Sequence, residues 1–172
     1  MSKRISLREF QENLARRLAT AHASEHRGLL GVQAGDENWL LSLPDAGEII
    51  SMTSLAPVSL AREWYRGLVN VRGVLYSVVD LSNFHDGPII SPSAQVRLLL
   101  IGARQNVHSA IMVSRVLGLH NDEDFDVDPS FRGTDSKPWV DARLFDTQNR
   151  PWLRLNVPRL LSSSTFLDAG IG

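Results

Sequence analysis

The residue types that carry most protein chemistry are present in this sequence, but their spacing predicts no catalytic or metal centre. The five histidines are His22, His26, His85, His108 and His120, and the pair His22 and His26 lacks the further ligands that a metal site needs. The serines form no Gly-x-Ser-x-Gly elbow, and the chain contains neither a Walker loop nor a dinucleotide-binding fingerprint. We therefore predict a protein that is not an enzyme and that uses no cofactor or metal.

An acidic segment at residues 121–128, with the sequence NDEDFDVD, has an alternation of acids similar to that of calcium-binding loops. It lacks the glycine that such loops have at the sixth position, and Pro129 and Ser130 follow where the distal glutamate would stand. We predict a solvated acidic loop here, with cation binding as the alternative.

Composition excludes several classes of partner and compartment. The formal net charge is −1, from 18 basic and 19 acidic residues, which argues against a general attraction to nucleic acid or to an anionic membrane. The chain has no cysteine, so disulfides and cysteine-ligated zinc are absent, as fits a cytosolic protein. The longest apolar run, at residues 96–103 and apolar apart from Arg97, is too short to span a bilayer, and no signal peptide is evident. We expect a cytoplasmic protein with no direct membrane insertion.

The elements that must position any functional residue begin with a helix. Between Ser6 and Ala21, apolar residues recur at helical spacing along one stripe, and Ser6 with Glu9 forms a capping-box signature. The stripe consists of Leu7, Phe10, Leu14 and Leu18. Three interpretations are open: the helix packs on its own domain, it docks on a partner, or the segment is a frayed tail.

The rest of the chain is predicted to be mainly β. Short apolar runs separated by Gly, Pro, Asn and Asp indicate about ten strands, a pattern typical of small barrels or a sandwich. The expected strands lie at residues 28–33, 38–43, 48–52, 68–71, 74–79, 96–102, 109–113, 116–119, 140–145 and 152–155, and a short helix is expected at 156–161.

A hairpin in the middle of the sequence is the strongest local signal. Two apolar runs, Leu68–Val71 and Val74–Val79, are separated by Arg72 and Gly73, and glycine supplies the positive φ that a tight turn needs. The second run is apolar at nearly every position, so we expect both its faces to be covered. Asp80 then stands where its carboxylate can cap a helical turn that begins at Leu81.

The run GLVNVRGVLYSVVDL, residues 67–81, strongly resembles the central signature of CheW-like domains, which is G-x-x-N-x-R-G, a short apolar strand and D-L. The matching residues are Gly67, Asn70, Arg72, Gly73, Asp80 and Leu81. Ser77 stands where many members have a proline. Glu48 falls where the family places a glutamate near the signature arginine.

The resemblance covers residues 27–161. It includes Ala110–Leu119 in the middle of the chain and the ending L-x-L-N-V-x-x-L-L at residues 153–161. The amphipathic segment before the first strand is similar to that of the CheW-like proteins of type IV pilus (twitching) pathways.

The resemblance implies a fold of two small five-stranded SH3-like barrels packed together, preceded by the amphipathic helix. We expect residues 1–26 to form the helix and a linker, and residues 27–161 to form the CheW-like domain. The first barrel would span about 27–84, with its last strand supplied by a distant part of the chain, and the second would span about 96–155. Residues 162–172, which are rich in serine, would form a mobile tail.

The function that the resemblance implies is that of a non-catalytic adaptor. Its partners would be the regulatory domain of a CheA-type histidine kinase and the cytoplasmic tip of a methyl-accepting chemoreceptor, which would lie in the groove between the barrels. The adaptor would sit at membrane-associated receptor arrays. The residues expected to contact the kinase are Glu48, Gly67, Asn70, Arg72 and Gly73.

Alternatives to this function make different predictions. Arg72 is either a solvated hairpin tip or the partner of Glu48 in an ion pair that fixes a loop at the interface. A small-barrel nucleic-acid-binding module would need a basic groove with exposed aromatic residues, and an enzyme would need a polar cluster in a pocket.

Overall fold

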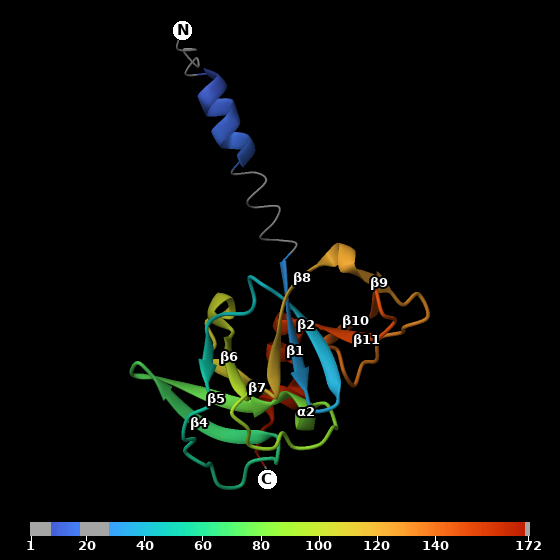
Figure 1. Ribbon diagram of the computed structural model, residues 1–172. Helices are drawn as coiled ribbons and strands as arrows, with labels where there is room; N and C mark the ends of the chain where they lie inside the picture. The colour runs from blue at the N-terminus through green and yellow to red at the C-terminus, as the bar shows by residue number, and fades with distance from the viewer. Residues whose placement is uncertain (1–7, 18–27, 171–172) are drawn as a thin grey trace.

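Two packed β-sheets form the body of the protein, as expected for a mainly β fold (Figure 1). The computed structural model describes residues 8–17 and 28–170. The first sheet has the order β8 (Arg115–Asn121), β1 (Gly28–Ala34), β2 (Glu37–Ser42), β11 (Pro151–Leu155), β10 (Val140–Asp146) and β9 (Phe125–Val127). The second sheet has the order β3 (Ile49–Ser51), β6 (Arg97–Ile101), β7 (Ser109–Val113), β5 (Val74–Asp80) and β4 (Tyr65–Val71).

Short helical segments connect and close the sheets. They are α2 (Leu81–Phe84), η1 (Ala103–Gln105), η2 (Asp122–Asp124), α3 (Val157–Ser162) and α4 (Ser164–Leu167). The predicted cap of α2 is confirmed, because the carboxylate of Asp80 accepts from Asn83 N at 3.0 Å. Asp80 is fully buried, and the same carboxylate also accepts from Ile90 N at 2.8 Å. Burial raises the pKa of Asp80, although these backbone donors act against that rise.

The two sheets take their strands from different parts of the chain, and the barrel spans of 27–84 and 96–155 stay a prediction. The second sheet uses the continuous stretch β3–β7, residues 49–113, whereas the first sheet combines β1 and β2 with β8–β11. The reason is that β2 carries Trp39, Leu40 and Leu41, all fully buried, and needs a strand on each side. Strand β1 pairs with it on one side, and β11 from the far end of the chain pairs with it in parallel on the other.

The segment predicted as a solvated acidic loop contains a strand that the sequence analysis missed. Strand β9 pairs with β10, and its first residue, Phe125, is buried against Trp152 with ring centroids 5.3 Å apart. The carboxylate of Asp128 is also buried and lies 3.0 Å from Arg143 Nε. One aromatic residue therefore anchors a stretch whose charges suggested a loop.

The segment predicted as a mobile tail, residues 162–172, includes the last residue of α3 and the whole of α4. Ser163 caps α4 by accepting from Phe166 N at 3.2 Å, and Phe166 packs against the main core. Serine, which suggested a linker by its abundance, acts here as a helix cap. Residues 171 and 172 lie outside the described residues.

The predicted amphipathic helix is present as α1 at residues 8–17. Two residues of its apolar stripe, Phe10 and Leu14, are 58% and 49% exposed, so these two side chains do not pack on the domain. Leu7 and Leu18 lie outside the described residues, as do His22 and His26. In the stretches 8–17 and 28–170, no helix has the length and apolar character needed to cross a bilayer.

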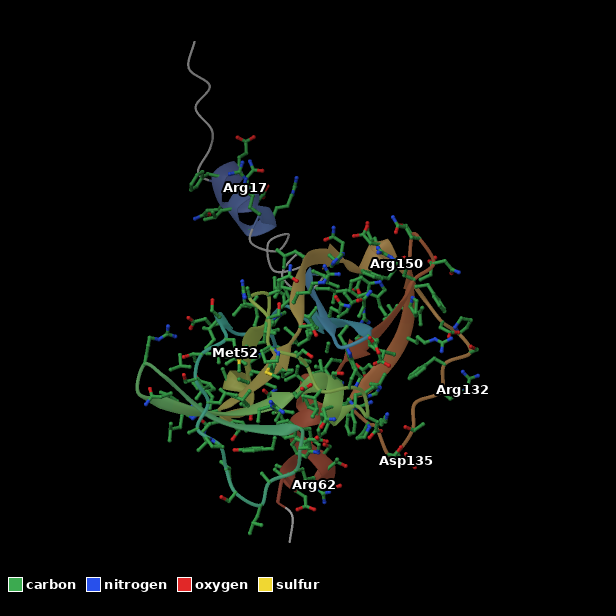
Figure 2. All side chains as sticks on the ribbon, turned by 60° about the horizontal axis from the view of Figure 1, so that its bottom comes forward. Arg17, Met52, Arg62, Arg132, Asp135 and Arg150 are labelled. Atoms are coloured by element: carbon green, nitrogen blue, oxygen red, sulfur yellow. The ribbon has the colours of Figure 1, made fainter. Side chains whose placement is uncertain are left out.

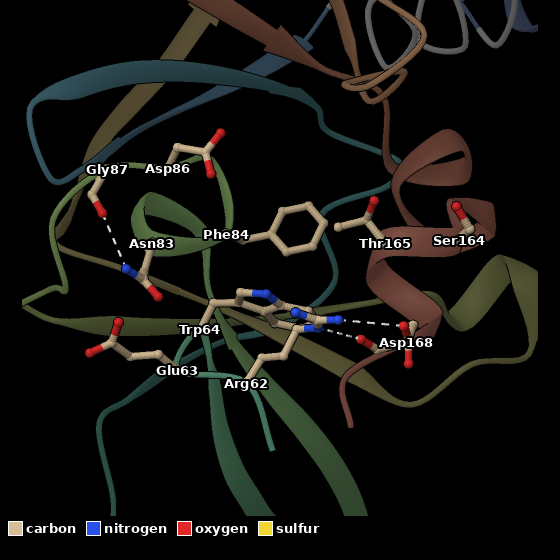
Figure 3. Close-up of a pocket in the computed structure, with 10 residues that line it drawn as sticks. All are labelled: Arg62, Glu63, Trp64, Asn83, Phe84, Asp86, Gly87, Ser164, Thr165 and Asp168. Carbon is tan, nitrogen blue, oxygen red and sulfur yellow. Dashed lines mark hydrogen bonds and ion pairs between the residues drawn. The ribbon is translucent and has the colours of Figure 1, made fainter. Parts of the chain in front are cut away.

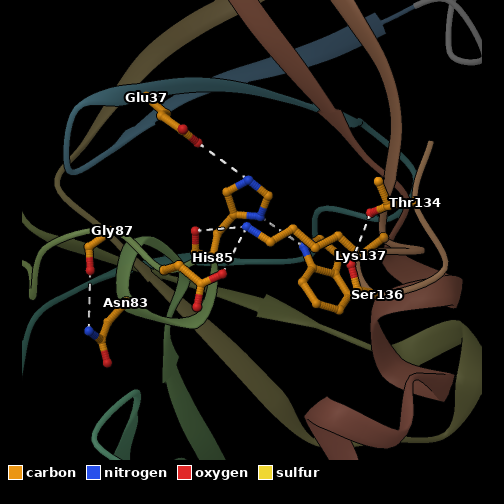
Figure 4. Close-up of polar contacts among 9 residues, drawn as sticks. Glu37, Asn83, His85, Gly87, Thr134, Ser136 and Lys137 are labelled. Atoms are coloured by element: carbon orange, nitrogen blue, oxygen red, sulfur yellow. Dashed lines mark hydrogen bonds and ion pairs between the residues drawn. The ribbon is translucent and has the colours of Figure 1, made fainter. Parts of the chain in front are cut away.

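The imidazole ring of His85 joins the two sheets through three contacts, and Figure 4 shows the one with Glu37. His85 follows α2, and its ring meets Trp39 of β2 edge-on at 4.8 Å. Trp139 Nε1 donates to His85 Nδ1 at 3.2 Å, and His85 Nε2 lies 3.7 Å from Glu37 Oε2. Because Nδ1 accepts a hydrogen bond, the imidazole must be neutral with its proton on Nε2. Burial, and secondly the charge of Lys137, lower the pKa of His85 to about 4.

We predict that this histidine makes the fold sensitive to mild acid. The unfolded chain binds the proton near the ordinary histidine pKa of about 6.5, whereas the folded protein resists it until about pH 4. The contribution is therefore complete above about pH 6.5 and is lost as the pH falls towards 4, by about 2–3 kcal/mol in the free energy of unfolding.

Urea unfolding between pH 4 and pH 8 measures this effect. The His85→Gln protein should lose less stability than the wild type over the acid half of that range. His108→Gln, which changes an exposed histidine, should retain the wild-type slope. Equal slopes for wild type and His85→Gln would contradict the assignment.

Candidate functional site

The β4–β5 hairpin, which extends away from the body of the molecule in Figure 1, carries most of the predicted site residues. Val71 pairs with Val74, so the loop has two residues, Arg72 at φ 50° and Gly73 at φ 84°. Positive φ at both positions defines a type I′ turn, which suits the twist of a hairpin. Asn70 Oδ1 accepts from Gly73 N at 2.9 Å and holds the turn in place.

The predicted ion pair between Arg72 and Glu48 is confirmed. Arg72 Nη1 donates to Glu48 Oε1 at 2.9 Å, and Nη2 donates to Oε2, so the contact is bidentate. The hydrogen bond from Arg72 lowers the pKa of Glu48, and the same bond raises the pKa of Arg72. The two side chains remain 71% and 43% exposed, so the pair adds little to the stability of the fold. Its effect is to fix the hairpin tip against the segment that enters β3.

Gly67 is buried against the backbone of Ala56, so it does not belong to the exposed group around the ion pair. It lies at a bulge in β4 with φ 128°, and a Cβ at this position would lie 2.3 Å from the carbonyl oxygen of Ala56. Ala56 and Leu68 exchange two backbone hydrogen bonds of 2.8 and 2.9 Å across the same contact. The structure therefore brings together Glu48, Asn70, Arg72 and Gly73, and it separates Gly67 from them. Whether any of the five residues contacts a partner stays a prediction.

Apolar side chains close to the ion pair in sequence were not identified as site residues. Leu75 is 58% exposed and Ile49 is 41% exposed, and Val74 and Met52 are exposed as well. We expected β5 to be covered on both faces, but this is wrong for the tip, because only Val78, Val79 and Asp80 are buried. A long hairpin carries its distal residues beyond the neighbouring strands, a geometry that a run of apolar letters does not reveal.

A cleft of about 840 Å³ lies between the segment before β4, α2 and α4 (Figure 3). Trp64 and Phe84 form its aromatic base, with ring centroids 4.9 Å apart at nearly a right angle. Trp64 is only 8% exposed, as expected for a core residue. The other lining residues are polar: Arg62, Glu63, Asn83, Asp86, Gly87, Ser164, Thr165 and Asp168. In the part of the chain that is described, no three His, Asp or Glu residues are placed to hold a metal ion.

Comparisons with known proteins match the chain to a family, to a relative and to a solved structure. The family described as CheW-like domain matches residues 28–165 of this chain. Protein PilI of Pseudomonas aeruginosa is 24% identical over 148 residues, covering 83% of this chain and 79% of its own length. The crystal structure of scaffolding protein TtCheW from Thermoanaerobacter tengcongensis superposes with a TM-score of 0.65 at 16% identity. That match covers 81% of this chain and 94% of the other.

The two glycines of the hairpin should differ in their response to substitution. Gly67→Ala adds a Cβ against a backbone carbonyl at a positive φ, so we expect a loss of about 3 kcal/mol or more in the free energy of unfolding. Gly73→Ala meets nothing within 4 Å and suffers only the left-handed penalty, about 1 kcal/mol. Urea denaturation measures both losses, and equal losses would contradict the account of Gly67.

Proposed function

Because this chain belongs to the CheW-like domain family, whose members are non-catalytic scaffold proteins, we propose that it couples a chemoreceptor to a CheA-type histidine kinase. The single observation that carries the proposal is the bidentate pair of Arg72 and Glu48 at an exposed hairpin tip. The fold gains little from this pair, so an ordered charged surface is available to another protein.

The kinase contact would lie on the hairpin tip and its surroundings. Charged groups there are held in one geometry, and Leu75 and Ile49 provide exposed apolar surface beside them. Interfaces commonly combine an apolar centre with a polar rim, and oriented charges favour the correct partner over others. The expected contact residues are Glu48, Asn70, Arg72 and Gly73, while Gly67 would act through the shape of the strand.

The receptor would occupy the cleft over Trp64 and Phe84. A concave surface with an aromatic base and a polar rim suits a helical segment that brings apolar side chains. Modest affinity at each contact becomes sufficient when many adaptors and kinases are assembled together, so we propose a cytoplasmic position at receptor arrays. The similarity to protein PilI supports a role in type IV pilus (twitching) signalling, with flagellar chemotaxis as the other pathway.

Reversal of the hairpin charge tests the kinase contact. Arg72→Glu places two carboxylates together at the tip, so we expect about a tenfold or greater loss of affinity for the kinase regulatory domain. The melting temperature should stay within a few degrees of wild type, because the pair is exposed. Titration calorimetry and thermal unfolding measure the two quantities.

Two further variants of this protein serve as a control and as a test of the ion pair itself. Arg132→Glu alters an exposed arginine in the loop before β10 (Figure 2) and should bind the kinase domain as the wild type does. The exchange Glu48→Arg with Arg72→Glu should recover part of the lost affinity if the pair acts by ordering the tip. Unchanged binding by Arg72→Glu, or salt-dependent binding of the wild type to nucleic acid instead of the kinase domain, would reject the proposal.

A further inference from the structure

The segment after α3 turns back along one side of the cleft, and it has little regular secondary structure of its own. Helix α4 has four residues, fewer than an isolated helix needs to persist in water. Its internal bonds run from Leu167 N and Asp168 N to the carbonyls of Ser163 and Ser164, at 3.1 and 3.0 Å. The conformation of residues 163–170 therefore depends on what these residues touch, and we refer to them as the strap.

Two kinds of contact hold the strap. Phe166 stacks nearly parallel to Trp64, at 6.4 Å between centroids and 18° between planes, and meets Phe84 edge-on at 5.8 Å. Ser163 donates from N and Oγ to Leu160 O of α3, and the polar contacts of the strap with the opposite side all involve Arg62. Arg62 Nε donates to Asp168 O at 3.0 Å, and Arg62 N donates to Ala169 O at 2.8 Å. The ion pair of Arg62 and Asp168, at 3.5 Å, is largely exposed.

The strap also forms one wall of the cleft, as Figure 3 shows. Ser164, Thr165 and Asp168 line it, opposite Asn83 and Gly87 of the α2 region. Phe166 lies against the same two aromatic rings that form the base of the cleft. Movement of the strap would therefore widen the cleft and expose Trp64 and Phe84 together.

We infer that the strap covers part of the aromatic base of the cleft, and that an apolar side chain of the receptor helix displaces Phe166 from Trp64 and Phe84 when that helix enters. The identity of the displacing partner rests on the proposed function, whereas the strap itself belongs to the free protein. If the strap is open about 10% of the time, the affinity of the cleft for its ligand is reduced about tenfold.

Hydrogen exchange on the full-length free protein tests the strap without any partner. The amides of Phe166, Leu167 and Asp168 should exchange at least about 100-fold faster than those of the buried strand β7, because they open without global unfolding. The amide of Arg62, which donates to Ala169, should exchange with the strap. Protection of these amides equal to that of β7 would overturn the inference.

Substitution of the anchor tests displacement. Phe166→Ala should shift tryptophan emission to longer wavelength and should raise the affinity for a soluble receptor-tip fragment about tenfold. Leu167→Ala changes a neighbouring side chain that is 70% exposed, and it should alter neither quantity. The emission shift should disappear in a Phe166→Ala, Trp64→Phe protein.

Affinity that stays constant or falls in a folded Phe166→Ala protein would overturn the inference, as would an equal gain in Leu167→Ala. If the receptor fragment binds neither the wild type nor the Phe166→Ala protein while the strap amides exchange rapidly, the proposed partner is refuted and local opening of the strap is supported. Loss of kinase binding in Arg72→Glu is independent of both results, because that contact lies on the hairpin.

Discussion

One shared apolar core determines the architecture of this protein. Residues of both sheets pack into the same cluster, in which Trp39 of the first sheet and Leu98 and Ile111 of the second are fully buried. Neither sheet could keep this surface from water alone, since each depends on the other to cover its inner face. The two sheets are therefore fixed relative to each other.

Polar groups at the contact between the two sheets add a geometric constraint to that packing. His85 follows the second sheet, but its ring is fixed by Trp39 and Trp139 of the first sheet and the segment that enters it. The imidazole must be neutral to accept the hydrogen bond from Trp139. Buried polar contacts of this kind have strict geometry, so they select one relative orientation among those that an apolar interface alone would allow. By contrast, Arg72 and Glu48 form their pair where solvent reaches it, and that pair shapes a surface without determining the fold.

The pair of Arg72 with Glu48 was expected from the family resemblance, since the two residues are 24 positions apart. Local signals in the sequence were sufficient to predict the hairpin, the turn at Arg72 and Gly73, and the cap at Asp80. Each of these depends on residues a few positions apart or on a motif with a defined spacing. The resemblance implied that one barrel takes a strand from a distant part of the chain, but local signals could not identify the parallel pairing of Leu153 with Trp39. The strap was missed because one aromatic residue, Phe166, outweighs the serines around it.

The parallel pairing of β2 with β11 also bears on how the chain is made. Strands β3–β7 are contiguous, so all five strands of the second sheet are available for pairing before the first sheet is complete, although its inner face still needs the first sheet to cover it. The first sheet holds β1 and β2 from the beginning of the domain but cannot be completed until the last strand has been synthesised. Its early strands, including the apolar β2, must wait unpaired along one edge during translation, which is the state in which nascent chains depend most on chaperones.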